Sequence, residues 1–135
     1  MQFLSGLTWN AQTLGALSAA SSVLLGAFGS HGLKNNLSDL PKDDQSYYLD
    51  IWKTAAQYQM YHSIGMIIAP MICKHVGMPS MKAWPHSAKL FASGIAFFSG
   101  SLYTLVLTRT KFLGAITPIG GVLFAAGWVA MACRE

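Results

Sequence analysis

The chain has 135 residues, of which 53% are hydrophobic and only 10% charged, with a formal net charge of +4. A soluble domain usually carries about 25% charged residues, so this composition excludes an ordinary soluble globule and is typical of a single membrane domain over residues 1–135. The basic residues form no continuous run, which argues against a nucleic-acid partner. The two cysteines belong to no CxxC or Cys/His set, so we expect free thiols.

The first predicted span covers residues 12–32, and no charged side chain precedes Lys34. About 20 apolar residues are enough to cross the ~30 Å hydrocarbon core of a bilayer. Gly15, Ala19, Ser22 and Gly26 are spaced by four, three and four residues, which places them on one helix face. Small residues let another helix approach closely in lipid. The pattern predicts that this helix is the hub of a bundle, with its leucine side facing lipid.

A polar loop is predicted for residues 34–50, because four of the five acidic residues lie there. The glycines of the sequence GSHG, residues 29–32, suggest that the first helix ends just before this loop. Within the loop, Pro41 followed by Asp43 and Asp44 is typical of a helix start. We therefore expect the second helix to begin in water and to enter the membrane near Lys53.

The second span, residues 53–73, is the most polar of the four. Tyr58, Gln59, His62 and Ser63 lie within its first half, and Tyr103 of the third span is the predicted neighbour of this group. Polar groups at membrane depth are costly unless they face the interior of a bundle. The five residues are therefore a candidate polar intramembrane cluster. Two roles are open for this cluster: its side chains form hydrogen bonds that hold the helices together, or they line a proton relay or polar pore.

The third and fourth spans are predicted over residues 87–107 and 112–132. The turn TRTK at 108–111 is so short that these spans must be antiparallel neighbours. In the fourth span Gly114, Gly121 and Ala125 share one line, while Thr117 and Pro118 interrupt the helix early and predict a bend. The resulting fold class is an all-α membrane protein with four transmembrane helices in an antiparallel bundle, both termini on the same side. The lysines and arginines are divided almost equally between the two sides, which leaves the orientation open.

Several stretches together resemble a known family: GAFGSHGL, TAAQYQMYHS, ASGIAFFSGSLY and ITPIGG followed by GW. They are similar to the small four-helix membrane family known in animals as transmembrane protein 256, whose bacterial relatives carry a domain of unknown function. The resemblance runs from Leu14 to about Ala132. It implies a four-helix membrane fold and, for eukaryotic members, an association with mitochondria. It brings no reaction, ligand or catalytic residue.

Sites with reactive chemistry are disfavoured by what the sequence lacks. His31 and His62 are a conceivable haem or metal pair, but no carboxylate or thiolate lies at a matching depth, so we expect neither a metal nor another cofactor. The sequence shows no nucleophile–base arrangement and no phosphate-binding glycine loop. These observations predict a protein that is not an enzyme.

The expected function is that of a structural or accessory subunit of a larger membrane complex. With the resemblance, the expected place is the mitochondrial inner membrane and a respiratory-type complex. The expected partners are the lipid bilayer and other membrane subunits. The alternative is a small transporter or channel that uses the polar half of the second span, and a lipid- or quinone-binding module is the third possibility.

Overall fold

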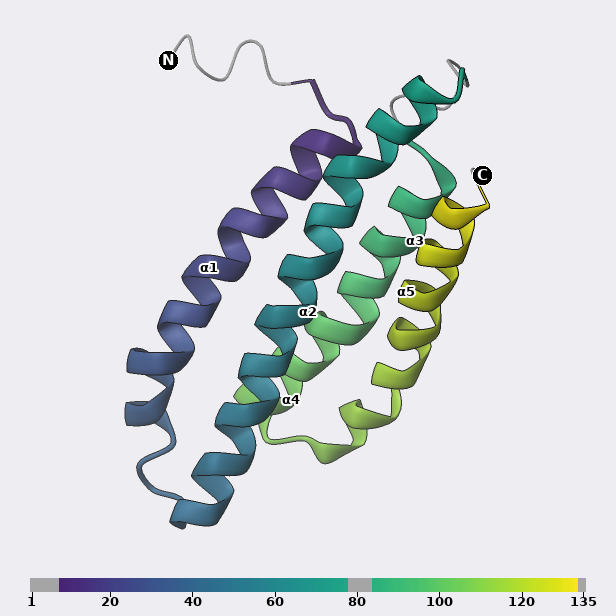
Figure 1. Ribbon diagram of the computed structural model, residues 1–135. Helices are drawn as coiled ribbons and strands as arrows, with labels where there is room; N and C mark the ends of the chain where they lie inside the picture. Colours follow the sequence, from purple (N-terminus) through teal and green to yellow (C-terminus); the bar gives the residue numbers. More distant parts are fainter. Residues whose placement is uncertain (1–7, 78–83, 134–135) are drawn as a thin grey trace, which may run out of the picture.

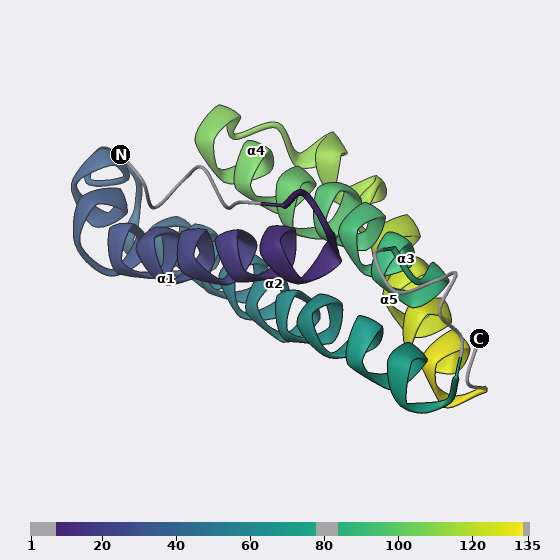
Figure 2. The ribbon, with the colours of Figure 1, turned by 90° about the horizontal axis from the view of Figure 1, so that it is seen from above.

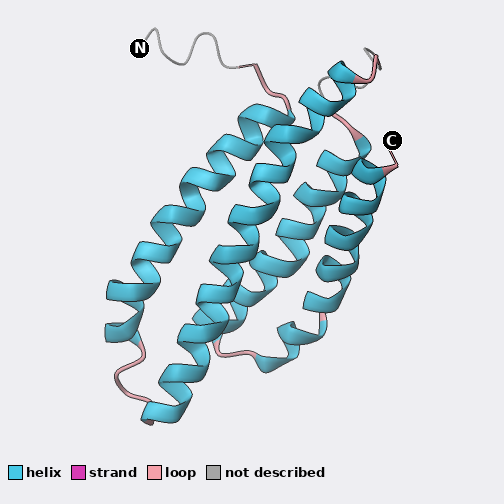
Figure 3. Ribbon diagram, in the orientation of Figure 1, coloured by secondary structure: helices cyan, strands magenta, loops and turns pink. Residues whose placement is uncertain are grey.

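The computed structural model describes residues 8–77 and 84–133, and these residues form helices joined by short connections (Figures 1 and 3). The elements in order are α1 (Ala11–Asn36), α2 (Lys42–His75), α3 (His86–Ile95), the π-helix η2 (Ala96–Gly100), α4 (Ser101–Thr108), the 3-10 helix η3 (Lys111–Ala115) and α5 (Thr117–Ala132). Because α3, η2 and α4 follow one another without a break, they form a single rod of 23 residues, His86–Thr108.

Helix α1 lies along α2 with the opposite chain direction. A Cβ atom added to Gly15, near the start of α1, would lie 2.8 Å from the backbone oxygen of Ser63, whereas Gly29, near the end of α1, lies against Trp52. Figure 2, viewed from above, shows α1 beside α2 on one side of the molecule and α5 on the other. The first turn of α1 and the last turn of α5 lie at the same end of the molecule (Figure 1).

The central element is α2, which packs against α1, α3, η2 and α4. The prediction that α1 is the hub is therefore wrong, since α1 packs almost entirely on α2. The physical reason is the polarity of the two helices. Polar side chains in a membrane helix need partners inside the bundle, and a central position supplies neighbours on several faces. The more apolar α1 can instead leave one face uncovered.

Three rods of the described chain are long and apolar enough to cross a membrane: Ala11–Asn36, His86–Thr108 and Lys111–Ala132. The fourth rod, α2, has 34 residues but is too polar to meet the same criterion. At 1.5 Å per residue it is about 51 Å long, which exceeds the ~30 Å hydrocarbon core.

The connection between α1 and α2 is much shorter than the predicted loop at 34–50. Only residues 37–41 lie outside helices, because α1 continues through the GSHG sequence to Asn36. Gly29 does not cap the helix; it provides room for the ring of Trp52. The predicted helix start is confirmed, since α2 begins at Lys42 directly after Pro41. Two aspartates in its first turn meet the positive end of the helix dipole.

The predicted interruption of the last span is present, but as a new helix start. The short helix η3 ends at Ala115, and α5 begins at Thr117. Pro118 therefore lies in the first turn of α5, where its missing N–H group has no intrahelical partner to lose.

Helix α5 packs on a different line from the predicted one. Its buried residues are Gly120, Phe124 and Gly127. Gly121 and Ala125 lie one position further along, which is about 100° around the helix. A Cβ atom added to Gly121 would meet nothing within 4 Å, Ala125 is exposed, and Gly114 makes only an ordinary contact with Leu105. The buried line is the one that other elements contact closely: the backbone of η2 at Phe98 packs on Gly120, and the ring of Phe91 packs on Gly127.

The predicted face of α1 also includes one misplaced residue. Gly15 and Ser22 are buried and Ala19 is half-buried. Gly26, however, has no atom within 4 Å of the position of a Cβ atom, so no helix backbone packs closely there.

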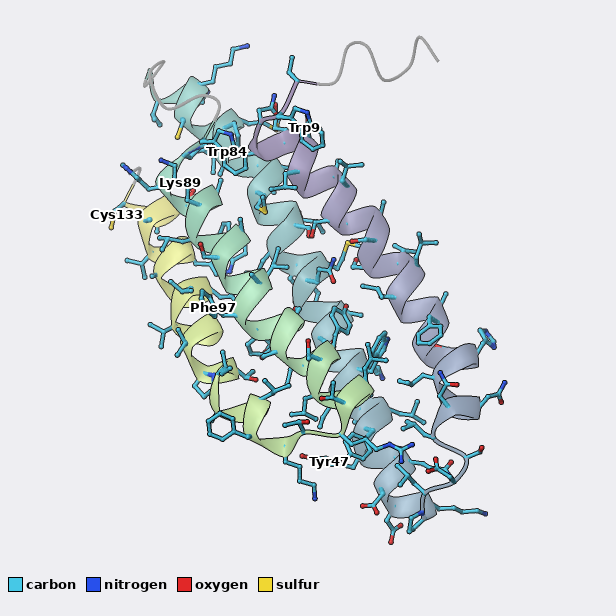
Figure 4. All side chains as sticks on the ribbon, turned by 180° about the vertical axis from the view of Figure 1, so that it is seen from behind. Trp9, Tyr47, Trp84, Lys89, Phe97 and Cys133 are labelled. Atoms are coloured by element: carbon cyan, nitrogen blue, oxygen red, sulfur yellow. The ribbon has the colours of Figure 1, made fainter. Side chains whose placement is uncertain are left out.

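Aromatic side chains mark both ends of the molecule. Figure 4 shows Trp9 and Trp84 near one end and Tyr47 near the other. Trp9 is 71% exposed and Tyr47 is 48% exposed. Exposed tryptophan and tyrosine at the two ends of a helical bundle are typical of the two membrane–water interfaces.

Candidate functional site

The predicted polar cluster is divided between two faces of α2. Gln59 and Ser63 are four residues apart and face α1, where they bond to Ser18. Tyr58 and His62, also four residues apart, belong to an aromatic cluster with residues of η2 and α5. Neighbouring positions on a helix differ by about 100°, so residues 58 and 59 cannot share one site.

The first part is a closed hydrogen-bond network centred on Gln59, which is buried. The side-chain nitrogen of Gln59 donates to the backbone oxygen of Ser18 at 3.0 Å and to the hydroxyl of Ser21 at 2.8 Å. The hydroxyl of Tyr103 donates to the Gln59 side-chain oxygen at 2.9 Å. The Ser63 hydroxyl donates to Ser18 Oγ at 2.7 Å. The Ser63 oxygen also lies 2.6 Å from the backbone carbonyl oxygen of Gln59. One amide thus ties α1, α2 and α4 together.

Two members of this network, Ser18 and Ser21, were missed by the sequence reasoning. The first span was predicted as an apolar helix with one face of small residues, and these two serines were not considered as hydrogen-bonding groups. The available signal was the spacing of Ser18, Ser21 and Ser22, three and four residues apart, which places hydroxyl groups on one side of the helix. A polar partner helix at the same depth is what such hydroxyls need.

The second part surrounds His62, which is 5% exposed. Its Nδ1 atom lies 2.7 Å from the backbone oxygen of Tyr58, and because a carbonyl only accepts, Nδ1 carries the hydrogen. The ring is stacked on Phe124, with centroids 3.4 Å apart and planes 4° apart. Phe91 and Trp128 lie at centroid distances of 5.6 Å and 6.0 Å. His62 is packed as an aromatic ring rather than as a member of the Gln59 network.

Trp52 is a third buried residue with a polar group, at 3% exposure. Its indole N–H donates to the backbone oxygen of Leu25 in α1 at 2.7 Å. The ring contacts Tyr103, with centroids 4.6 Å apart, so it links α1 to α4 across α2.

Within residues 8–77 and 84–133, every buried side-chain nitrogen and oxygen atom has a hydrogen-bond partner. The same residues contain no group of three histidine, cysteine, aspartate or glutamate side chains that is able to hold a metal ion. His31 is exposed on α1, two residues beyond the Gly29–Trp52 contact. It is therefore separated along α2 from the level of His62 by about twelve residues, or roughly 18 Å. The two histidines do not form a common site.

An ion pair joins the two connections at one end of the molecule. Both Nη atoms of Arg109 donate to the carboxylate of Asp39 at 2.9 Å, and Nη2 also donates to the Asn36 backbone oxygen at 3.2 Å. The guanidinium holds the pKa of Asp39 below its ordinary value of 3.8, and the carboxylate in turn raises the pKa of Arg109. The sequence predicts only a polar loop around Asp39 and gives no local signal for its pairing with Arg109.

Comparisons with known proteins show that the chain is similar to membrane proteins of bacteria. A UPF0382 membrane protein of Staphylococcus aureus is 49% identical over 117 residues, which is 86% of each chain. The UPF0382 membrane protein YwdK of Bacillus subtilis is 40% identical over 119 residues, covering 86% of this chain and 87% of its own. No solved structure matches the chain.

Residues 25–121 match the family described as "Protein of unknown function (DUF423)". The predicted resemblance to a small membrane family with bacterial relatives is therefore confirmed. The expected mitochondrial location finds no support, because these relatives are bacterial. The match includes Gln59, Ser63 and Tyr103 but not Ser18 and Ser21. It also includes His62 and Phe91, whereas Phe124 and Trp128 lie beyond its end. On these grounds the chain belongs to the DUF423 family of membrane proteins.

Proposed function

We propose that the chain crosses the membrane four times as an antiparallel bundle, with both termini on one side. The fourth crossing is α2, whose polar residues Gln59, His62 and Ser63 are buried by the other helices and bonded within the chain. Since α2 is about 51 Å long, its charged first turns extend beyond the hydrocarbon core. Protease-accessible tags fused to the two ends test this topology. Equal accessibility in sealed vesicles is expected, and opposite accessibility would rule out four crossings.

We further propose that the protein is a non-catalytic structural or accessory subunit that packs against another membrane protein. The observation that supports this role is the closed state of the polar network: Gln59 uses both its amide nitrogen and its oxygen on partners in the same chain. Groups that are already bonded to each other stabilise helix packing and offer no free ligand to a substrate. We make this proposal for a membrane complex without assigning it to mitochondria, because the relatives found are bacterial.

The outer face of α1 is the part of the molecule proposed to meet a partner. Leu24 is 72% exposed and Leu17 is 47% exposed, and α1 packs on little besides α2. A photo-crosslinking residue at Leu24 is the most direct test when combined with mild detergent extraction from the native membrane. A stoichiometric adduct with one protein of defined mass is expected. A matched crosslinker at Val122 of α5, which is 68% exposed, reports whether the adduct is specific to α1.

The transporter or channel alternative makes the opposite prediction. Flux of protons or small solutes through liposomes that contain the purified protein, lost in Gln59→Leu, would contradict the structural role. Purification as a free monomer, with only lipid adducts at Leu24, would also contradict it.

A further inference from the structure

An open groove of about 540 Å³ lies between α1 and α2, toward the end where the two helices are connected. Its lining is divided into an apolar part and a charged part: Val23, Gly26 and Met60 line the first, and Lys34, Asp50 and Lys53 line the second. A pocket of this size is within the range of 300–1,000 Å³ that holds small-molecule ligands.

The groove exists because α1 and α2 do not pack closely at Gly26. A Cβ atom at this position would meet nothing within 4 Å, whereas one added to Gly29, less than one turn further along, would collide with Trp52. The indole of Trp52 donates to the Leu25 backbone oxygen, which fixes the ring in the wall of the groove. The open floor at Gly26 is therefore bordered by a rigid contact between the two helices.

The charged end of the groove carries a net positive charge. Lys34 comes from the last turn of α1 and Lys53 from α2, and Asp50 contributes one opposing carboxylate. In the described part of the chain the one ion pair within 4.0 Å is Arg109–Asp39, so neither lysine is paired with Asp50 at that distance. From Lys34 back to Val23 the groove follows α1 over eleven residues, which is roughly 16 Å.

We propose that this groove binds an anionic phospholipid. One acyl chain lies along Val23, Gly26 and Met60, and the phosphate lies between Lys34 and Lys53 at the membrane surface. Basic pockets between transmembrane helices select acidic lipid headgroups in this way. A helix of a protein partner would cover the apolar part but would leave the two unpaired lysines without an anion. The proposal rests on the four-crossing topology but not on the accessory-subunit role.

The test is native mass spectrometry of the purified protein after incubation in nanodiscs that contain equal amounts of phosphatidylglycerol and phosphatidylcholine. Wild-type protein is expected to retain one phosphatidylglycerol in preference to phosphatidylcholine. The double variant Lys34→Gln, Lys53→Gln is expected to lose roughly 10–30-fold in this preference, because each basic residue near the surface contributes a few-fold in affinity. Lys42→Gln, at the same end of the molecule but outside the groove, is the matched control.

A second variant fills the groove without removing charge. Gly26→Leu has space for its side chain, so it is expected to keep the thermal stability of the protein while it abolishes retention of the lipid. Gly121→Leu in α5 is the control, since it also adds a side chain where a Cβ atom would meet nothing within 4 Å. Equal retention of the two lipids by wild type would overturn the proposal. An unchanged preference for phosphatidylglycerol in the double lysine variant would also overturn it. This second outcome does not depend on whether Gly26→Leu folds.

Discussion

At the scale of single residues, Gln59 shows how a strongly polar side chain is accommodated at membrane depth. Its amide has donors and an acceptor, and all are used: the nitrogen bonds to two serines of α1 and the oxygen accepts from Tyr103. The neighbouring Gln57 is exposed and bonds only to Tyr61 on its own helix. Substitution of these two glutamines, only two positions apart, is therefore expected to change the stability of the protein by different amounts.

Gln59→Leu is expected to lower the free energy of unfolding in detergent by about 1–3 kcal/mol. The substitution leaves the Tyr103 hydroxyl and the α1 groups without their buried partner. Gln57→Leu is the matched control and should change stability by less than ~0.5 kcal/mol. Unfolding with a steric-trap or SDS titration measures both. Equal effects of the two variants would mean that the network does not stabilise the packing of α1.

His62 is a second residue whose role the structure defines, because its ring lies in a stack rather than in a polar network. His62→Phe is expected to cost less than ~1.5 kcal/mol, since the new ring occupies a similar volume among aromatic neighbours. His62→Ala is expected to cost about 2–5 kcal/mol through the cavity that it leaves. Thermal unfolding in detergent measures the difference. A phenylalanine variant as unstable as the alanine variant would show that the imidazole nitrogens are needed.

At the scale of elements, glycines of one helix serve as contact points for aromatic rings of the next. A Cβ atom added to Gly65 of α2 would lie 2.7 Å from the ring of Phe91, and one added to Gly127 of α5 would lie 2.6 Å from the same ring. Gly94 of α3 has the same relation to Phe124. Small residues thus allow close packing. The groups that they accommodate here are aromatic side chains as well as helix backbones.

Gly120→Ala is expected to destabilise the protein by about 1–3 kcal/mol, because the new Cβ atom would lie 2.8 Å from the Cα atom of Phe98, in the backbone of the π-helix η2. A backbone segment cannot move aside as a flexible side chain can. Gly121→Ala, one position along, has open space and is expected to be neutral or slightly stabilising. The melting temperatures of the two variants, measured in the same detergent, test whether Gly120 rather than Gly121 faces the η2 backbone. A larger loss in Gly121→Ala would mean that α5 is rotated toward the line predicted from sequence.

At the scale of the whole molecule, the chain forms two helical hairpins, α1 with α2 and the rod α3–η2–α4 with α5, which are joined at one end by the Arg109–Asp39 pair. The pair connects residues 70 positions apart in sequence. Arg109 has a left-handed backbone conformation, with φ of 56°, which ends α4 and turns its side chain toward Asp39. Beneath this pair lies a core cluster that both hairpins share: Leu33, Leu37, Tyr48, Trp52, Leu105 and Val106.

From the Arg109–Asp39 pair we expect the folded protein to lose stability in acid. Since the pKa of Asp39 is lower in the folded protein than its ordinary value of 3.8, the pair stabilises the fold fully above that value and loses its contribution as the pH falls through the lowered pKa. Melting temperatures measured in detergent from about pH 6 to pH 3 should fall less steeply in Asp39→Asn than in wild type.

The control for this prediction is Asp50→Asn, which removes an exposed carboxylate beyond the first turn of α2 that takes part in no ion pair within the described residues. It should leave the acid slope of the melting temperature close to that of wild type. Added salt should reduce the difference between wild type and Asp39→Asn, because an exposed pair is screened. Identical acid slopes in wild type and Asp39→Asn would show that the pair does not couple the hairpins.

The sequence by itself determined the helical class, the approximate positions of the apolar helices and the start of α2 directly after Pro41. These features depend on local composition: the length of an apolar run, the conformation that proline imposes and the acidic residues of a first turn. The sequence also indicated that Gln59, Ser63 and Tyr103 belong to a polar group, together with Tyr58 and His62, because polar side chains in a membrane helix need partners inside the bundle.

The tertiary structure decided which helix is central, which line of glycines is buried and how the polar residues are divided. Adjacent positions such as Gly120 and Gly121 are equivalent in composition, and only the η2 backbone at Phe98, which packs on Gly120, distinguishes the two. The separation of His62 from Gln59 likewise depends on the different neighbours of two faces of α2. Helix rotation and the pairing of distant residues such as Asp39 and Arg109 are set by contacts between elements, and local sequence does not encode them.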